Sequence, residues 1–128
     1  MSRPWIIDGG LATGLEKLGH RLHPRLWSAG VFLENPRAVE DLHAAYLDAG
    51  AEILVTASYQ MSFAALAQEG LEPQVAAAAM RGTVAVARRA RERCGKAAMV
   101  AASIGPYGAT LADGSEYRGA YEIGRAHV

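Results

Sequence analysis

The sequence predicts an α/β fold built around a parallel β-sheet, and two observations support this. Three short apolar segments, WIIDGG (5–10), AEILVTASY (51–59) and AAMVAASIGPYG (97–108), are too short for amphipathic helices. Their continuous apolar character is typical of strands buried on both faces. Helical patterns with clear start and stop signals lie between them. This order favours parallel strands joined by right-handed crossovers.

The first predicted strand ends in an acid and two glycines, Asp8-Gly9-Gly10. A buried carboxylate loses solvation and glycine loses backbone entropy, so this combination is typical of a chain that turns sharply beside a ligand. The next two strands end in Ser58-Tyr59-Gln60 and in residues 103–108. All three ends should meet at one rim, where parallel α/β folds bind ligands. A plainer role for Asp8 is the N-cap of a helix over LATGLEKLG (11–19).

The first crossover helix is predicted over residues 35–50. Asn35 is its candidate N-cap, Pro36 its first helical residue and Gly50 its stop signal. Three- and four-residue spacing predicts one buried stripe, made of Val39, Leu42, Ala45, Tyr46 and Ala49. His43 does not follow this spacing, so we expect it at the surface or at the edge of the stripe.

The second crossover helix is predicted over residues 72–95, with Pro73 near its start and Gly95 as its stop. Arginines occupy its last turns, where their positive charge interacts favourably with the negative end of the helix dipole. The run RRARER (88–93) is expected to form one solvated face. Cys94 lies at the end of this helix, away from the predicted rim, so we expect a structural or incidental thiol.

Composition excludes several classes of partner. Thirteen acidic and thirteen basic residues balance, and RRARER is the only basic run, so nucleic acid is not an expected partner. The single cysteine excludes an internal disulfide and a multi-cysteine zinc site in this chain, and it fits a reducing compartment. There is no signal-peptide pattern and no apolar run near the roughly 18 residues of a membrane helix. We therefore expect a soluble, cytoplasmic protein with no membrane partner.

Other ligand motifs are absent or weak. Neither DGGLATG nor GPYGATLADG fits the dinucleotide fingerprint, and no P-loop lysine pattern is present, so phosphate binding is not favoured. His20 and His23 are three residues apart in a predicted loop. They could ligate a metal, but ordinary loop positions are the expected alternative.

Three separated stretches resemble the homocysteine S-methyltransferase family, in the branch that uses S-methylmethionine or S-adenosylmethionine as methyl donor. They are DGGLATGLEKLG, LWSAGVFLENPRAVEDLHAAYLDAGAEILVTASYQ and VAASIGPYGATLADGSEYRGAY, within residues 5–121. The resemblance implies a zinc-dependent (β/α)8 TIM barrel that makes methionine. It implies that a zinc-bound homocysteine thiolate attacks the methyl group of a sulfonium donor, with zinc holding the thiol in its reactive form.

The resemblance also implies roles for four residues. Asp8 and Gly9 would contact homocysteine, and Tyr59 would lie near the metal and the donor. Tyr59 and Tyr107 could attract the sulfonium by cation–π interaction, worth about 0.5 to 2 kcal/mol. Packing under a loop is the alternative for either tyrosine. DGSEYRG (113–119) is expected either as a lid over the barrel mouth or as a solvated turn.

The family's zinc is held by cysteines from late strands of the barrel, which this chain does not contain. We therefore expect no catalytic residue and no metal ligand here, and we place the zinc ligands in the missing C-terminal part. Eight strand–helix units need about 250 residues, so residues 1–121 are predicted to be the first three units of an incomplete barrel.

The last seven residues, EIGRAHV (122–128), break the family pattern. IGRAHV can be written ATC GGA AGA GCA CAC GTC, which matches a common sequencing-adapter sequence. We therefore predict a non-native tail at the end of a truncated homocysteine S-methyltransferase that is inactive on its own. The alternative is a partial-barrel binding or assembly module without catalytic activity, which would need a partner to cover its sheet.

Overall fold

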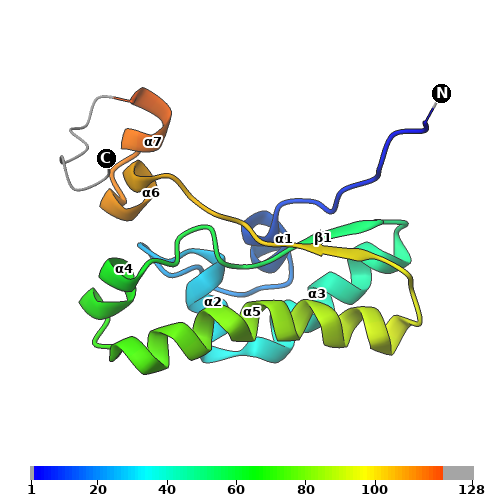
Figure 1. The fold of residues 1–128 in the computed structure, drawn as a ribbon, viewed down its shortest axis with the longest axis horizontal. Coiled ribbons are helices and arrows are strands. Elements are labelled where there is room, and N and C mark those ends of the chain that lie inside the picture. Colours follow the sequence, from blue (N-terminus) through cyan, green and yellow to red (C-terminus); the bar gives the residue numbers. More distant parts are fainter. Residues whose placement is uncertain (1, 120–128) are drawn as a thin grey trace.

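A computed structural model describes residues 2–119, and Figure 1 shows a small sheet lying above a layer of helices. The predicted tail at 122–128 lies outside the described residues. The elements are α1 (Leu11–Lys17), α2 (Ser28–Glu34), α3 (Pro36–Asp48), β1 (Ile53–Val55), α4 (Phe63–Gln68), α5 (Pro73–Cys94), β2 (Met99–Ala101), α6 (Tyr107–Leu111) and α7 (Ser115–Arg118). The mixed α/β class predicted from the sequence is confirmed.

The sheet is parallel, as predicted. Strands β1 and β2 pair in the register Ile53 to Met99, Leu54 to Val100 and Val55 to Ala101. Ile7 adds a single parallel bridge to Ile53 on the other side of β1. The three predicted strand segments therefore lie side by side in chain order.

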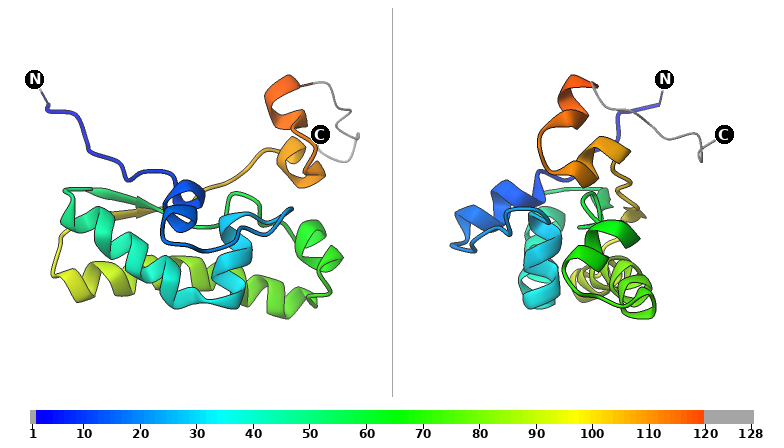
Figure 2. Two further views of the ribbon diagram at one scale, coloured as in Figure 1. Left: turned by 180° about the vertical axis from the view of Figure 1, so that it is seen from behind. Right: turned by 90° about the vertical axis from the view of Figure 1, so that its left-hand side faces the viewer.

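The first segment is not the buried strand that the sequence predicted. Trp5, Ile6 and Ile7 are each more than half exposed, and only Ile7 forms a bridge. Figure 2 shows the N-terminal segment leaving the body of the fold. Within residues 2–119 it has one neighbour, β1, so its other edge and much of its apolar surface face solvent. β-pairing gains stability when both edges and a face are covered.

The helix boundaries follow the predicted signals. The Asn35 side chain accepts a hydrogen bond from the Ala38 N–H at 3.2 Å, and Pro36 opens α3. Pro73 opens α5, which ends at Cys94 with Gly95 in the left-handed conformation (φ 61°). Only glycine adopts this conformation at little steric cost, so it stops the helix cleanly.

The predicted buried stripe of α3 is partly wrong. Val39 and Leu42 are buried as expected, but Ala45 and Ala49 are exposed. His43, Ala44 and Leu47 are buried instead. Helix α3 packs against α5 on one side and against α1 and α2 on another, so its buried arc is wider than one stripe and is rotated from the predicted one. His43 is therefore fully buried, not at the surface.

An ion cluster joins α3 to α5, which lie side by side beneath the strands (Figure 2). The Glu40 carboxylate on α3 accepts hydrogen bonds from Arg89 Nε at 3.0 Å and Arg93 Nη1 at 3.1 Å, both on α5. Arg93 also bonds Asp41 at 2.8 Å. The run RRARER is thus only partly the solvated face that was predicted.

Candidate functional site

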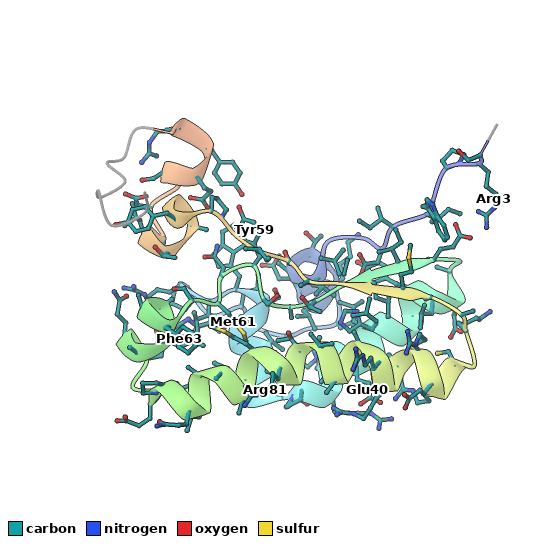
Figure 3. The ribbon with its side chains drawn as sticks, viewed as in Figure 1. Arg3, Glu40, Tyr59, Met61, Phe63 and Arg81 are labelled. Carbon is teal, nitrogen blue, oxygen red and sulfur yellow. The ribbon has the colours of Figure 1, made fainter. Side chains whose placement is uncertain are left out.

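A hollow of about 500 Å³ lies at the carboxyl ends of the parallel segments. Three chain segments predicted to share a rim contribute to it, through Asp8-Gly9-Gly10, Tyr59 and Ser103. Its full lining is Ile7, Asp8, Gly9, Gly10, Leu11, Ala12, Thr13, Trp27, Ser28, Val55, Thr56, Tyr59 and Ser103. Figure 3 shows Tyr59 on the loop after β1, away from the helix layer that carries Arg81 and Glu40. The structure therefore brings Asp8, Gly9 and Tyr59 together.

Asp8 is fixed by two bonds to the β1 segment. Its backbone N–H donates to the Ile53 carbonyl at 2.9 Å, and its Oδ2 accepts from the Val55 N–H at 2.9 Å. Its side chain is only 2% exposed. Burial raises the pKa of this carboxyl, and the Val55 N–H partly offsets the rise. Helix α1 has Gly10 at its N-cap with no side-chain cap bond, so the alternative role of Asp8 as that cap is wrong.

His43 lies behind Asp8, inside the helix layer. Its Nδ1 is 3.9 Å from Asp8 Oδ2, which is too long for a hydrogen bond. Within the part of the chain that the structure describes, neither ring nitrogen has a hydrogen-bond partner. Burial lowers the pKa of His43 to about 4, so the ring is neutral at pH 7.

Gly9 is packed against the side chain of Tyr46, which lies on α3. The Tyr46 hydroxyl donates to the Gly10 carbonyl at 3.0 Å. A Cβ on Gly9 would lie 2.8 Å from both Tyr46 Cε1 and Tyr46 Oη, closer than real Cβ contacts. The absence of a side chain at Gly9 therefore lets Tyr46 hold the turn, a reason that the sequence alone did not indicate.

Hydroxyl groups tie the ends of β1 and β2 together. Thr56 Oγ1 and Ser58 Oγ are 2.7 Å apart, and Ser58 Oγ donates to the Ser103 carbonyl at 2.8 Å. The Ser103 N–H donates back to Thr56 Oγ1 at 3.0 Å. This closed set of bonds fixes two of the three rim segments relative to each other.

The two predicted tyrosines differ in their placement. Tyr59 is half-buried and lines the hollow. Its carbonyl oxygen would be 2.1 Å from a Cβ on Gly105, so the third rim segment packs directly on its backbone. Tyr107 opens α6, is 46% exposed and is not among the residues that line the hollow.

Trp27 is a rim residue that the sequence reasoning missed. It lines the hollow and is 38% exposed. Its backbone has φ 48° and ψ −121°, a region that residues with a side chain rarely adopt. One feature of the sequence could have identified it: a large aromatic residue stands directly before the start of α2, in a loop rather than on an apolar helix face.

The remaining predicted candidates lie elsewhere. Within residues 2–119 no group of three or more His, Cys, Asp or Glu side chains could hold a metal ion, so the His20 and His23 alternative gains no support. Cys94 is a free, half-buried thiol whose Sγ lies 4.0 Å from the Ala44 carbonyl oxygen. DGSEYRG contains the short helix α7, in which the Ser115 N–H donates to Asp113 Oδ1 at 2.9 Å.

Comparison with known proteins identifies the family. The sequence model of the homocysteine S-methyltransferase family matches residues 5–128. The chain belongs to the homocysteine S-methyltransferase family. The resemblance read from the three motifs is therefore confirmed.

Curated members of this family show how much of a relative's length the chain matches. It is 45% identical over 122 residues to the homocysteine S-methyltransferase of Escherichia coli, covering 91% of this chain and 39% of that protein. It is 42% identical over 127 residues to homocysteine S-methyltransferase YbgG of Bacillus subtilis, covering 92% and 40%. The chain spans about two fifths of the length of the curated relatives it matches.

A solved structure agrees with this fold. The crystal structure of the homocysteine methyltransferase MmuM from Escherichia coli, metallated form, superposes with a TM-score of 0.86 at 44% identity. The match covers 94% of this chain and 44% of that one. That relative carries a metal, whereas the described residues of this chain do not form a group fit to hold one. None of the helices within 2–119 is both long and apolar enough to cross a membrane.

Proposed function

We propose that this chain is the N-terminal part of a homocysteine S-methyltransferase. The whole enzyme would transfer a methyl group from a sulfonium donor, S-methylmethionine or S-adenosylmethionine, to homocysteine and so form methionine. The observation that carries this proposal is the hollow, where Asp8, Gly9 and Tyr59 meet at the carboxyl ends of parallel segments. Family membership supports the same reaction.

The proposed architecture is the first three strand–helix units of a (β/α)8 barrel. The three parallel segments lie in chain order, and helices lie along one side of the sheet. In barrels of this kind, substrates bind at the carboxyl ends of the strands. The hollow occupies that position in the three segments seen here.

Asp8 is proposed to bind the amino group of homocysteine. A carboxylate can accept several hydrogen bonds, and the Val55 N–H uses one acceptor site on Oδ2. An ammonium group at the hollow would compensate the burial that raises the pKa of Asp8. Gly9 is proposed to let the homocysteine backbone approach the turn closely, in addition to its packing against Tyr46.

Tyr59 is proposed to contact the methyl donor. A sulfonium carries a positive charge, and an aromatic face attracts it by about 0.5 to 2 kcal/mol. Trp27 lines the same hollow and supplies a second aromatic surface. Tyr107 remains a proposed donor contact in an arrangement where α6 lies over the hollow.

The metal of this enzyme is proposed to be zinc, held by cysteines outside this chain. The described residues do not fit a zinc site, because they form no group of three or more potential ligands and the sequence contains one cysteine. The contribution of this chain is therefore to bind and orient the substrates. We propose that the chain alone is inactive, and that the full enzyme works in the cytoplasm.

A hybrid enzyme tests this function. Residues 5–119 would replace the matching segment of the Escherichia coli enzyme, and methyl transfer from S-methylmethionine to homocysteine would be measured with zinc present. We expect activity from the hybrid and none from the isolated chain. Asp8→Ala in the hybrid should raise the KM for homocysteine about tenfold or more, as expected for one lost charge-assisted bond, while bound zinc stays unchanged.

Two results would contradict the proposal. Methyl transfer by the isolated chain would show that our placement of the metal site is wrong. Normal homocysteine kinetics in the Asp8→Ala hybrid would show that Asp8 has only a structural role. Among the described residues no observation favours the alternative of a stand-alone binding module.

A further inference from the structure

His23 organises the turn that leads into α2. Its Nδ1 accepts hydrogen bonds from two backbone N–H groups, those of Arg25 at 3.2 Å and Leu26 at 3.1 Å. Its carbonyl oxygen accepts from the Trp27 N–H at 2.9 Å. One residue thus receives bonds from three of the next four residues.

The bonding pattern assigns the tautomer of this ring. A nitrogen that accepts hydrogen bonds carries no proton, so the proton of neutral His23 lies on Nε2. Nε2 is 3.4 Å from Glu69 Oε2, just after α4. The two ring nitrogens therefore have different partners, the turn on one side and Glu69 on the other.

The His23 side chain is also packed closely against α2. A Cβ on Gly30 would lie 2.2 Å from the Cβ of His23. Only a glycine at this position leaves room for the histidine. The turn is thus held between α2 and the end of α4.

This turn ends at Trp27, which has an unusual backbone conformation. Its φ of 48° and ψ of −121° are unfavourable for a residue with a side chain. Such a conformation persists only where surrounding interactions fix it. The Trp27 N–H bond to the His23 carbonyl is one of these interactions, and the bond that the Trp27 carbonyl accepts from the Gly30 N–H at 3.1 Å is another. Trp27 lines the wall of the hollow together with the segment of Asp8.

We propose that His23 is a positioning residue for the substrate hollow. Its Nδ1 acts as a fixed acceptor for the turn and thereby holds the Trp27 indole in the wall. The functional part of this inference rests on the proposed function, because it takes the hollow as the substrate site. The structural part does not.

Two substitutions separate the roles of the two ring nitrogens. Asn places its Oδ1 the same number of bonds from the backbone as His Nδ1, so His23→Asn keeps the acceptor for the turn. Gln reaches one bond further, so His23→Gln keeps a polar group for Glu69 but displaces the acceptor. Both would be made in a Trp5→Phe background, which leaves Trp27 as the single tryptophan of the chain.

Acrylamide quenching of Trp27 fluorescence reports whether the indole stays in the wall. Trp27 is 38% exposed in the fold. In His23→Gln, release of the indole into solvent should raise the quenching constant about twofold, as expected for local opening of the turn. His23→Asn should match the parent, and so should the control His20→Gln in the same loop. Equal behaviour of the Asn and Gln variants, including loss of the fold in both, would overturn the proposal.

Kinetics in the hybrid enzyme test the functional part. His23→Gln should raise the KM for S-methylmethionine about fivefold with kcat nearly unchanged. His23→Asn should keep the parent KM. An unchanged KM in both variants would overturn the proposal that His23 affects substrate binding in the hollow. If the parent hybrid is inactive, the proposed function fails, and the quenching measurement still decides the role of His23.

Discussion

Asp8 Oδ2 and His43 Nδ1 lie 3.9 Å apart in a region from which solvent is excluded, with the Asp8 side chain 2% exposed and His43 fully buried. The acid belongs to the rim of the hollow, and the histidine belongs to α3 in the layer beneath. The rim and the helix layer thus each place one titratable group in this region, and burial shifts the pKa values of the two groups in opposite directions.

Acid should destabilise this fold through His43. Burial lowers its pKa from 6.5 to about 4, so the unfolded chain binds a proton that the folded chain does not bind between these values. The stability from this group is fully present above pH 6.5 and is lost as the pH falls to 4. The loss should reach about 3 kcal/mol. Urea unfolding at pH 7 and pH 4.5 measures it.

His43→Gln should remove most of this pH dependence, because its side chain does not titrate. His20→Gln is the matched control in a loop and should leave the dependence in place. Since Asp8 titrates in all of these variants, its contribution cancels in the comparison. An equally steep loss of stability in His43→Gln would assign the effect to other groups.

The negative charge of Asp8 should be unnecessary for stability but required for substrate binding. Asp8→Ala leaves the Val55 N–H without its acceptor, which should cost about 1 to 3 kcal/mol. Asp8→Asn keeps an acceptor oxygen and removes a charge whose burial raises the pKa of the acid, so its stability should equal or exceed that of the parent. In the hybrid enzyme both variants should bind homocysteine weakly. Tight binding by Asp8→Asn would show that the charge is not needed.

Gly9 and Gly10 should differ sharply although they are adjacent. A Cβ on Gly9 would lie 2.8 Å from the Tyr46 ring, whereas one on Gly10 would lie 3.7 Å from its nearest neighbour, Thr13 Oγ1. Gly9→Ala should therefore cost about 1 to 3 kcal/mol by overpacking, and Gly10→Ala should cost little. In a Tyr46→Ala background the cost at Gly9 should disappear. A persistent cost there would indicate backbone strain instead.

Within the ion cluster between α3 and α5, the buried Glu40 should contribute more to the free energy of unfolding than the half-exposed Asp41. Glu40 is buried and bonds two arginines, so Glu40→Gln should lower the free energy of unfolding by about 1 to 3 kcal/mol. Asp41 is half exposed, so Asp41→Asn should cost no more than about 1 kcal/mol. Thermal unfolding measures both, and equal losses would contradict the ranking.

The parts of the fold that local signals determine were predictable. Asn35, Pro36, Pro73 and Gly95 mark helix ends through their own backbone chemistry, and the structure confirms them. The parallel order and the common rim follow from the alternation of short apolar runs and helices. Asp8, Gly9 and Tyr59 meet as expected, while their roles toward substrate stay predictions.

The errors arose where tertiary contacts decide. A three- and four-residue spacing finds one helix face, but α3 has neighbours on several sides, so His43 was assigned to the surface. Residues 5–7 have the composition of a buried strand, yet burial depends on what covers them. Trp27 was missed because its importance comes from a backbone conformation that no single-residue preference indicates.

Helices α3 and α5 bury several small side chains in one core cluster, among them Ala44, Ala87 and Ala90, together with Leu47. Small side chains interlock less than large ones, so polar contacts can add to the alignment of the two helices. Glu40 lies between two arginines one turn apart on α5, so sliding would strand a buried charge. His43 follows Glu40 by one turn on α3. The ion cluster therefore favours one alignment of α3 along α5, and that alignment includes the position of His43 beneath Asp8.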